Sequence, residues 1–143
     1  MPDLKLTIND PKTGKSFTKV VPETESSFFR GRKIKESIHG DTFGMKGYEL
    51  VITGGSDTSG FPMRFDVEGQ GRKRPLLTKG PGVHIKRKGM KTRKTLAGNT
   101  SSNITAQLNM KITKHGTKNI DEIFGVKEEP KEETSKKQES PKK

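Results

Sequence analysis

The stretch ITGGSDTSGFPM, residues 52–63, lies at the junction of two strand-like segments and contains three glycines and one proline. A phosphate-binding loop would need backbone amides that converge at a helix N-terminus, with Lys or Ser/Thr nearby. Here the stretch joins two predicted strands, carries Asp57, and meets its first basic residue only at Arg64. We therefore expect a structural corner, in which glycines adopt positive φ and Asp57 closes an Asx-turn.

Outward from this corner, several segments alternate apolar and polar residues with the period of half-buried strands. These predicted strands are 4–8, 16–21, 48–53, 62–67 and 103–113. The first two flank the turn NDPKTGK and should form a hairpin. Residues 23–40 carry the best helical signal, but Gly31 weakens the middle, so we expect a short or broken helix packed on the sheet, and a single helical turn at 119–124. Such elements are typical of a small β-barrel or sandwich.

The length of 143 residues predicts one domain followed by a tail. Val, Ile, Leu and Phe number only 29, which allows a small core but not a large buried catalytic cavity. From Lys127 onward the chain has no apolar residue, so residues 126–143 are predicted to be a disordered charged tail. Residues 1–125 then form the single β-barrel domain, which includes the basic segment 69–120.

The net charge of +12 is concentrated in that basic segment. Residues 1–68 carry ten basic and ten acidic side chains, and residues 121–143 carry six and seven. Residues 69–120 carry thirteen basic and no acidic side chains. Because like charges on one surface repel each other, this segregation predicts an external polyanion, either nucleic acid or, less favoured, an acidic membrane surface. The alternative is a solvated basic face without a ligand.

The densest part of the basic segment is 72–94, where ten of 23 residues are Lys or Arg. Its glycines and proline exclude a continuous amphipathic helix of the kind that lies on membranes. It has no aromatic residue for stacking on bases, which favours phosphate and 2′-hydroxyl contacts with folded RNA. The candidate RNA-binding residues are Arg72, Lys73, Arg74, Lys79, Lys86, Arg87, Lys88, Lys91, Arg93 and Lys94.

Other function classes find little support in the sequence. The chain has no cysteine, its three histidines are isolated, and no nucleophile and base can be paired. We therefore expect no enzymatic activity, no cofactor and no metal. No apolar segment reaches the roughly 18 residues of a membrane span, and the N-terminus does not resemble a secretion signal, so a soluble cytoplasmic protein is expected.

The corner resembles the signature of the sixth small-subunit ribosomal protein of archaea and eukaryotes. Its fixed positions are filled by Gly54, Gly55, Asp57, Gly60, Pro62 and Met63. The similarity continues through GYELVITGG, RKRPLLTKG, GMKTRKTLAGN and ITAQLNMKI and covers roughly residues 2–117. The chain departs from the family at Ala97, where an Arg is usual, and at Met90, where a Glu is common. Eukaryotic members carry a long basic extension, whereas the sequence here continues into a short tail of mixed charge, so we expect it to be similar to the archaeal form.

The resemblance implies a β-barrel bound to ribosomal RNA of the small subunit, beside neighbouring ribosomal proteins on cytoplasmic ribosomes. It implies no catalytic activity, no membrane partner and no small-molecule substrate. A free regulatory or chaperone-like protein that binds RNA or DNA is the alternative, and an enzyme acting on RNA is the third hypothesis.

Overall fold

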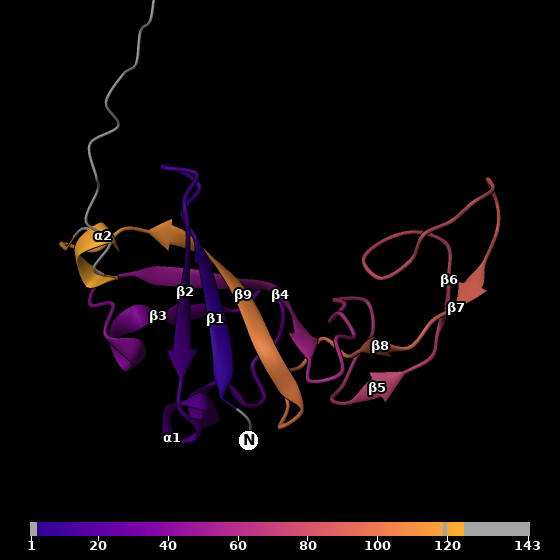
Figure 1. The fold of residues 1–143 in the computed structure, drawn as a ribbon, viewed down its shortest axis with the longest axis horizontal. Coiled ribbons are helices and arrows are strands. Elements are labelled where there is room, and N and C mark those ends of the chain that lie inside the picture. The colour runs from indigo at the N-terminus through magenta and orange to yellow at the C-terminus, as the bar shows by residue number, and fades with distance from the viewer. Residues whose placement is uncertain (1–2, 119, 125–143) are drawn as a thin grey trace, which may run out of the picture.

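A computed structural model describes residues 3–118 and 120–124. The predicted tail, 126–143, lies outside the described residues. The elements form a sheet and, beside it, a long arm (Figure 1). The strands are β1 (Leu4–Asn9), β2 (Ser16–Val21), β3 (Ser37–His39), β4 (Glu49–Asp57), β5 (Arg72–Lys73), β6 (Leu76–Leu77), β7 (Thr92–Arg93), β8 (Leu96–Ala97) and β9 (Thr105–Lys114). The helices are α1 (Glu23–Ser26) and α2 (Ile120–Ile123), with single 3-10 turns at Ser27–Phe29 and Gly40–Phe43.

The sheet has the strand order β2-β1-β9-β4-β3. β1 and β2 form the predicted antiparallel hairpin, and β1 runs parallel to β9, which pairs antiparallel with β4. The mostly β class is therefore confirmed. Over the described residues the outer strands β2 and β3 do not pair with each other, so the sheet is open and the predicted closed barrel is not found there.

The core is built from alternate residues of the three central strands, as their sequence periodicity predicts. The fully or almost fully buried side chains are Leu4, Leu6 and Ile8 of β1, Leu50 and Ile52 of β4, and Leu108, Met110 and Ile112 of β9. Phe29 and Phe43 join the same cluster, with their ring centroids 5.8 Å apart. One continuous apolar cluster thus makes the sheet a stable platform for the segments attached to it.

The helix expected over 23–40 is much shorter in the structure. Between residues 23 and 39 the chain is helical only from Glu23 to Phe29. Gly31 then adopts φ of +77° and Lys35 adopts φ of +76°, values that no α-helix accommodates. The chain turns back at these residues and enters β3. The expectation of a short or broken helix is confirmed, and its extension to residue 40 is wrong.

The strand expected over 62–67 is also wrong. Only Pro62 and Met63 take part in β-pairing, each through an isolated bridge. The next four residues form a turn that is closed by a hydrogen bond from the Val67 amide to the Arg64 carbonyl (3.4 Å). The turn redirects the chain from the sheet towards the arm, and Phe65 stands at its tip.

Candidate nucleic-acid interface

The arm comprises residues 72–97 and carries all ten predicted RNA-binding residues. It is an irregular two-stranded ribbon in which β5 pairs with β8 and β6 pairs with β7, over two residues each (Figure 1). Pro75 stands between β5 and β6, where its missing amide proton cannot extend the ladder. The loop 78–91 closes the ribbon at its outer end.

A small apolar cluster holds this loop against the ribbon. It consists of Leu77, Val83 and Leu96, with Ile85 packed against them. Gly82 lies so close to Leu96 that a Cβ atom there would be 2.7 Å from Leu96 Cδ2 and 2.8 Å from Cγ of Pro62. The arm is therefore folded, but on a much smaller core than the sheet.

The family signature at the corner attaches the arm to the sheet. Met63 is buried in the main core, and its amide donates to the Gly55 carbonyl (2.9 Å). On the other side of the connection, the Ala97 amide donates to the Pro62 carbonyl (3.0 Å). These contacts link the last strand of the arm to β4 through the residue pair Pro62–Met63.

The glycines of the corner do not all have the expected conformation. β4 continues through Gly54 and Gly55 to Asp57, and neither glycine has positive φ, so that expectation is wrong for both. Position 55 needs a glycine for another reason, because a Cβ atom there would lie 2.3 Å from the Gln107 carbonyl oxygen of β9. Gly60 does adopt φ of +79°, and the Asx-turn forms, with the Ser59 amide 3.2 Å from Asp57 Oδ1.

Asp57 makes an ion pair with Arg72 across the junction between corner and arm. Nε of Arg72 lies 2.5 Å from Oδ2 and Nη2 lies 3.1 Å from Oδ1, while a further hydrogen bond joins Nη2 to Ser59 Oγ (2.8 Å). The Asp57 side chain is only 1% exposed. The hydrogen bonds from Arg72, with smaller contributions from Thr58 and the Ser59 amide, lower the pKa of Asp57 to about 2 against the opposing effect of burial, and the pair raises the pKa of Arg72. The charge of Arg72 is thus already compensated within the protein.

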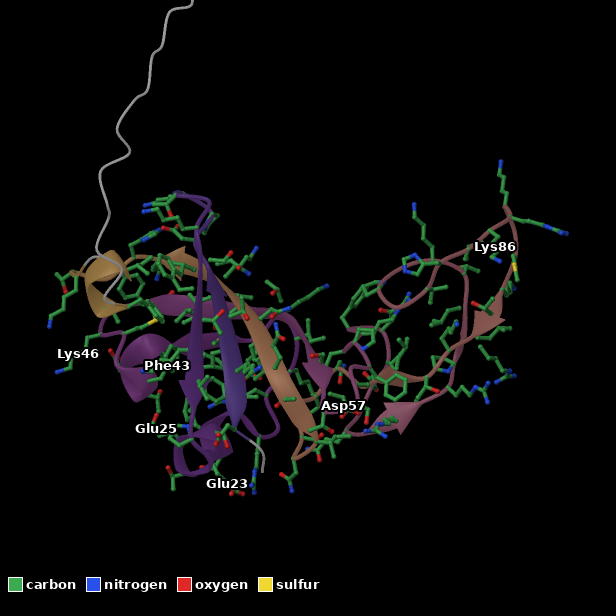
Figure 2. The ribbon with its side chains drawn as sticks, in the orientation of Figure 1. Glu23, Glu25, Phe43, Lys46, Asp57 and Lys86 are labelled. Atoms are coloured by element: carbon green, nitrogen blue, oxygen red, sulfur yellow. The ribbon has the colours of Figure 1, made fainter. Side chains whose placement is uncertain are left out.

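The other nine basic residues of the arm differ from Arg72. All nine are exposed, and none forms an ion pair with a carboxylate of residues 3–118 or 120–124. Lys73 reaches a backbone carbonyl, that of Glu68 (2.5 Å). Figure 2 shows Lys86 at the outer end of the arm, remote from Glu23 and Glu25 of α1. The arm therefore presents uncompensated positive charge to solvent.

A shallow hollow of about 460 Å³ lies at the end of the arm. Three cations, Lys79, Arg87 and Lys88, contribute to its wall, and Val83 and Met90 supply apolar surface. Met90 is 44% exposed, which is unusual for so large an apolar side chain beside so many charges. The hollow combines apolar and cationic surface within the segment predicted to bind RNA.

Arg64 is a site residue that the sequence did not reveal. Its side chain is only 10% exposed, its Nε pairs with Asp66 Oδ2 (2.6 Å), and its Nη2 donates to the Lys79 carbonyl (2.9 Å). A Cβ atom at Gly80 would lie 2.8 Å from Arg64 Nη1. Arg64 thus ties the outer loop to the corner. It belongs to the charge-balanced part of the sequence, where no local pattern distinguishes it.

The described residues contain no group of three or more His, Cys, Asp or Glu side chains arranged to hold a metal ion. Within the same part of the chain, no helix has the length and apolar character needed to cross a membrane. Neither observation adds a second candidate site to the arm and its junction.

A family model and individual relatives among known proteins all match the chain to one family of ribosomal proteins. Residues 4–125 match the family described as ribosomal protein S6e. The small ribosomal subunit protein eS6 of Methanocella arvoryzae is 43% identical over 128 residues, which is 90% of each chain. The eS6 protein of Methanocaldococcus jannaschii is 42% identical over 88% of this chain and 94% of its own. That of Archaeoglobus fulgidus is 41% identical over 89% of this chain and 99% of its own.

Proposed function

The chain belongs to the ribosomal protein S6e family, and from this premise we propose that it is a structural component of the small ribosomal subunit whose arm binds ribosomal RNA. The observation that carries the proposal is the set of nine exposed arm cations without a carboxylate partner in the described chain. This role would place the protein on cytoplasmic ribosomes beside other ribosomal proteins.

The arm is suited to the phosphate backbone rather than to reading bases. Each Lys or Arg that neutralises a phosphate releases condensed counterions, which makes binding favourable and strongly dependent on salt. Residues 72–94 contain no aromatic side chain, and Gly89 adopts φ of +82° with open space around it, so the backbone can approach a surface closely. Phosphate contacts of this kind position a protein on RNA but carry little sequence information.

The contacts at the junction between corner and arm give the sheet and the arm different roles. The apolar core keeps the sheet folded, the pair Asp57–Arg72 fixes the start of the arm, and Arg64 fixes its outer loop. An arm held at both ends loses less conformational freedom on binding RNA than a free basic peptide, which favours affinity. The protein would thus stabilise the RNA fold by bridging phosphates from a preformed surface.

A salt series with matched variants tests the proposal. If about six arm cations contact phosphates, a plot of log K against log salt for a small-subunit RNA fragment should have a slope of roughly −4 to −5. The double variant Arg87→Ala/Lys88→Ala should flatten the slope by about one to two units. The control Lys12→Ala/Lys46→Ala removes two exposed lysines of the sheet part and should change the slope much less. Equal effects of the two double variants would show that the arm charge is only a solvated face.

Residence on the ribosome separates the proposal from a free RNA-binding regulator. A structural component should sediment with small subunits in stoichiometric amount and stay bound through a moderate salt wash. A free regulator or chaperone would be recovered mainly at the top of the gradient. The sedimentation result is independent of the salt slope, because both kinds of protein would use phosphate contacts.

A further inference from the structure

Phe65 is an exposed aromatic residue at the base of the arm. The residue is 57% exposed, more than any other large hydrophobic residue in the described part of the chain; the others with large exposure are Val20, Leu76 and Met90. It lies within the turn 64–67, whose closing hydrogen bond joins Val67 to Arg64. A Phe with more than half of its surface in water contributes little to stability by burial, and the exposed part of its ring can contact a ligand.

Lys35 brings a cation to this ring from a distant part of the sequence. Its Nζ lies 4.6 Å from the centroid of Phe65. Lys35 has φ of +76° and is the single non-glycine residue with positive φ among residues 3–118 and 120–124. Such a backbone is strained for a residue with a Cβ atom, and persists only where surrounding contacts impose it. Here the Lys35 amide donates to the Ile52 carbonyl of β4 (2.8 Å).

A second cation lies over an aromatic ring at the same junction, and the two cations differ in whether a carboxylate compensates their charge. The guanidinium of Arg72 lies 5.2 Å from the centroid of Phe61. That charge is compensated by Asp57, whereas Lys35 has no ion pair with any carboxylate in the described chain. The Lys35–Phe65 pair therefore combines an exposed ring with an uncompensated positive charge.

We propose that Phe65 and Lys35 form a binding site for one unpaired nucleotide of the RNA held by the arm. The nucleobase stacks on the Phe65 ring, and the Lys35 ammonium pairs with a phosphate of the same strand. A nucleotide is the ligand class that offers a flat apolar face and a negative charge within a few ångströms of each other. The inference rests on the proposed RNA-binding function and adds to it a single-stranded element that the phosphate contacts of the arm do not require.

The position of Phe65 relative to the arm supports one continuous RNA surface. Its carbonyl accepts a hydrogen bond from Asn99 Nδ2 (3.3 Å), and its neighbour Arg64 donates to the Lys79 carbonyl of the outer loop. The Phe65 backbone is thereby fixed to the same short segment that positions the arm. The segment 72–94 has no aromatic ring for stacking, whereas such a ring is present where the arm meets the sheet.

Fluorescence offers a direct test, because the chain has no tryptophan. In the Phe65→Trp variant, an RNA hairpin with an unpaired loop should quench the introduced indole, while a blunt duplex of equal length should quench it much less. The matched control is Val20→Trp on β2, a residue 54% exposed in the wild type, which should respond to neither RNA. Quenching by the two RNAs to the same extent would overturn the assignment to an unpaired nucleotide.

Affinity measurements complete the test. Phe65→Leu should weaken binding of the looped hairpin about tenfold and binding of the duplex much less, while Phe65→Tyr should retain the loop preference. Lys35→Gly relieves the backbone strain, so it should fold well yet reduce the salt slope by about one. If Phe65→Leu leaves loop binding unchanged while Arg87→Ala/Lys88→Ala still flattens the slope, the stacking site is wrong and the arm remains the RNA-binding surface. Quenching only in assembled subunits, and never with RNA alone, would assign the ring to a neighbouring protein and likewise overturn the site.

Discussion

The sheet and the arm of this protein are stabilised in opposite ways. The sheet has a continuous apolar core with contributions from β1, β2, β3, β4 and β9, and residues 1–68 are electrically balanced. The arm has a separate cluster of three buried apolar side chains, ladders of only two residues, and ten cations with a single carboxylate partner in the described chain. Burial drives the folding of the sheet, whereas repulsion among like charges opposes the compactness of the arm.

This difference indicates that the arm depends on its junction with the sheet more than on its own contacts. Few buried contacts and many exposed backbone groups are the features of a segment that opens locally at low cost. RNA phosphates would relieve the repulsion and add stability that the isolated protein lacks. The following predictions compare the two regions, beginning with the largest effect.

The first prediction compares matched leucines in the two cores. Leu108 is fully buried in β9, so Leu108→Ala should lower the free energy of unfolding by about 3 to 4 kcal/mol. Leu77 lies in the small cluster of the arm with 9% exposure, and Leu77→Ala should cost about 1 kcal/mol or less in global unfolding. Urea denaturation of both variants gives the two values. Equal losses would mean that sheet and arm unfold as one cooperative unit.

The second prediction compares two glycines of the corner. In Gly55→Ala the new methyl group would meet the Gln107 carbonyl of the paired strand, which cannot move without separating β4 from β9, and the loss should be about 2 to 3 kcal/mol. Gly60→Ala has open space but positive φ, and should cost about 1 kcal/mol. Thermal unfolding of both variants measures the difference. A larger loss at Gly60 would show that backbone strain, not strand contact, dominates the corner.

The third prediction concerns acid and the ion pair at the junction. Because the pKa of Asp57 is about 2 in the folded chain and near 4 when unfolded, protons bind the unfolded state more readily. The stability from Asp57 is therefore complete above about pH 4 and is lost as the pH falls towards 2. It amounts to about 2 kcal/mol, given the buried carboxylate. Asp57→Asn should be less stable than the wild type by about this amount at neutral pH.

The pH profile of the same variant provides the internal control. The difference between Asp57→Asn and the wild type should shrink steadily below pH 4, because protonation removes the same charge from the wild type. A difference that stays constant down to pH 2 would mean that the loss comes from the Asx-turn rather than from the pair with Arg72.

The strands of the sheet could be predicted because their signal is local. Alternation located β1, β2 and the buried residues of β9 to within a few positions. The parallel pairing of β1 with β9 joins residues about a hundred positions apart, such as Leu6 and Leu108, and no local pattern encodes it. The strand predicted over 62–67 was wrong because the alternating apolar residues of this segment lie in a turn. Met63 is buried in the main core, while Phe65 remains exposed.

The candidate site, like the fold, could be predicted from the sequence only in part. Charge segregation alone located the cations of the arm, and their contact with RNA stays a prediction. The charge pattern could not show that Arg72 already forms an ion pair, because its partner Asp57 lies 15 residues away in the sequence. Lys35, Arg64 and Phe65 were missed because they belong to the charge-balanced part and gain their significance only from positions in space.

The last prediction has the smallest effect on the free energy of global unfolding and concerns the link that Arg64 makes between the sheet and the arm. Arg64→Lys keeps the positive charge but cannot reach Asp66 and the Lys79 carbonyl at once, because an ammonium lacks the planar fork of a guanidinium. Global stability should fall by about 0.5 kcal/mol or less, yet the outer loop should open more often. Amide hydrogen exchange should show this at Val83, whose amide donates to the Gly80 carbonyl (3.2 Å), as protection reduced about fivefold.

The control for this link is Arg74→Lys, a change at an exposed arm residue outside the junction, which should leave the exchange of Val83 as it is. The Leu108 amide, in the middle of β9, should exchange at the wild-type rate in both variants, because it reports opening of the sheet. Faster exchange at Val83 in Arg64→Lys alone would establish that one buried guanidinium couples the rigid sheet to the charged arm. Unchanged exchange there would mean that the Leu77–Val83–Leu96 cluster holds the loop without it, and that the arm is more independent of the sheet than the contacts of Arg64 indicate.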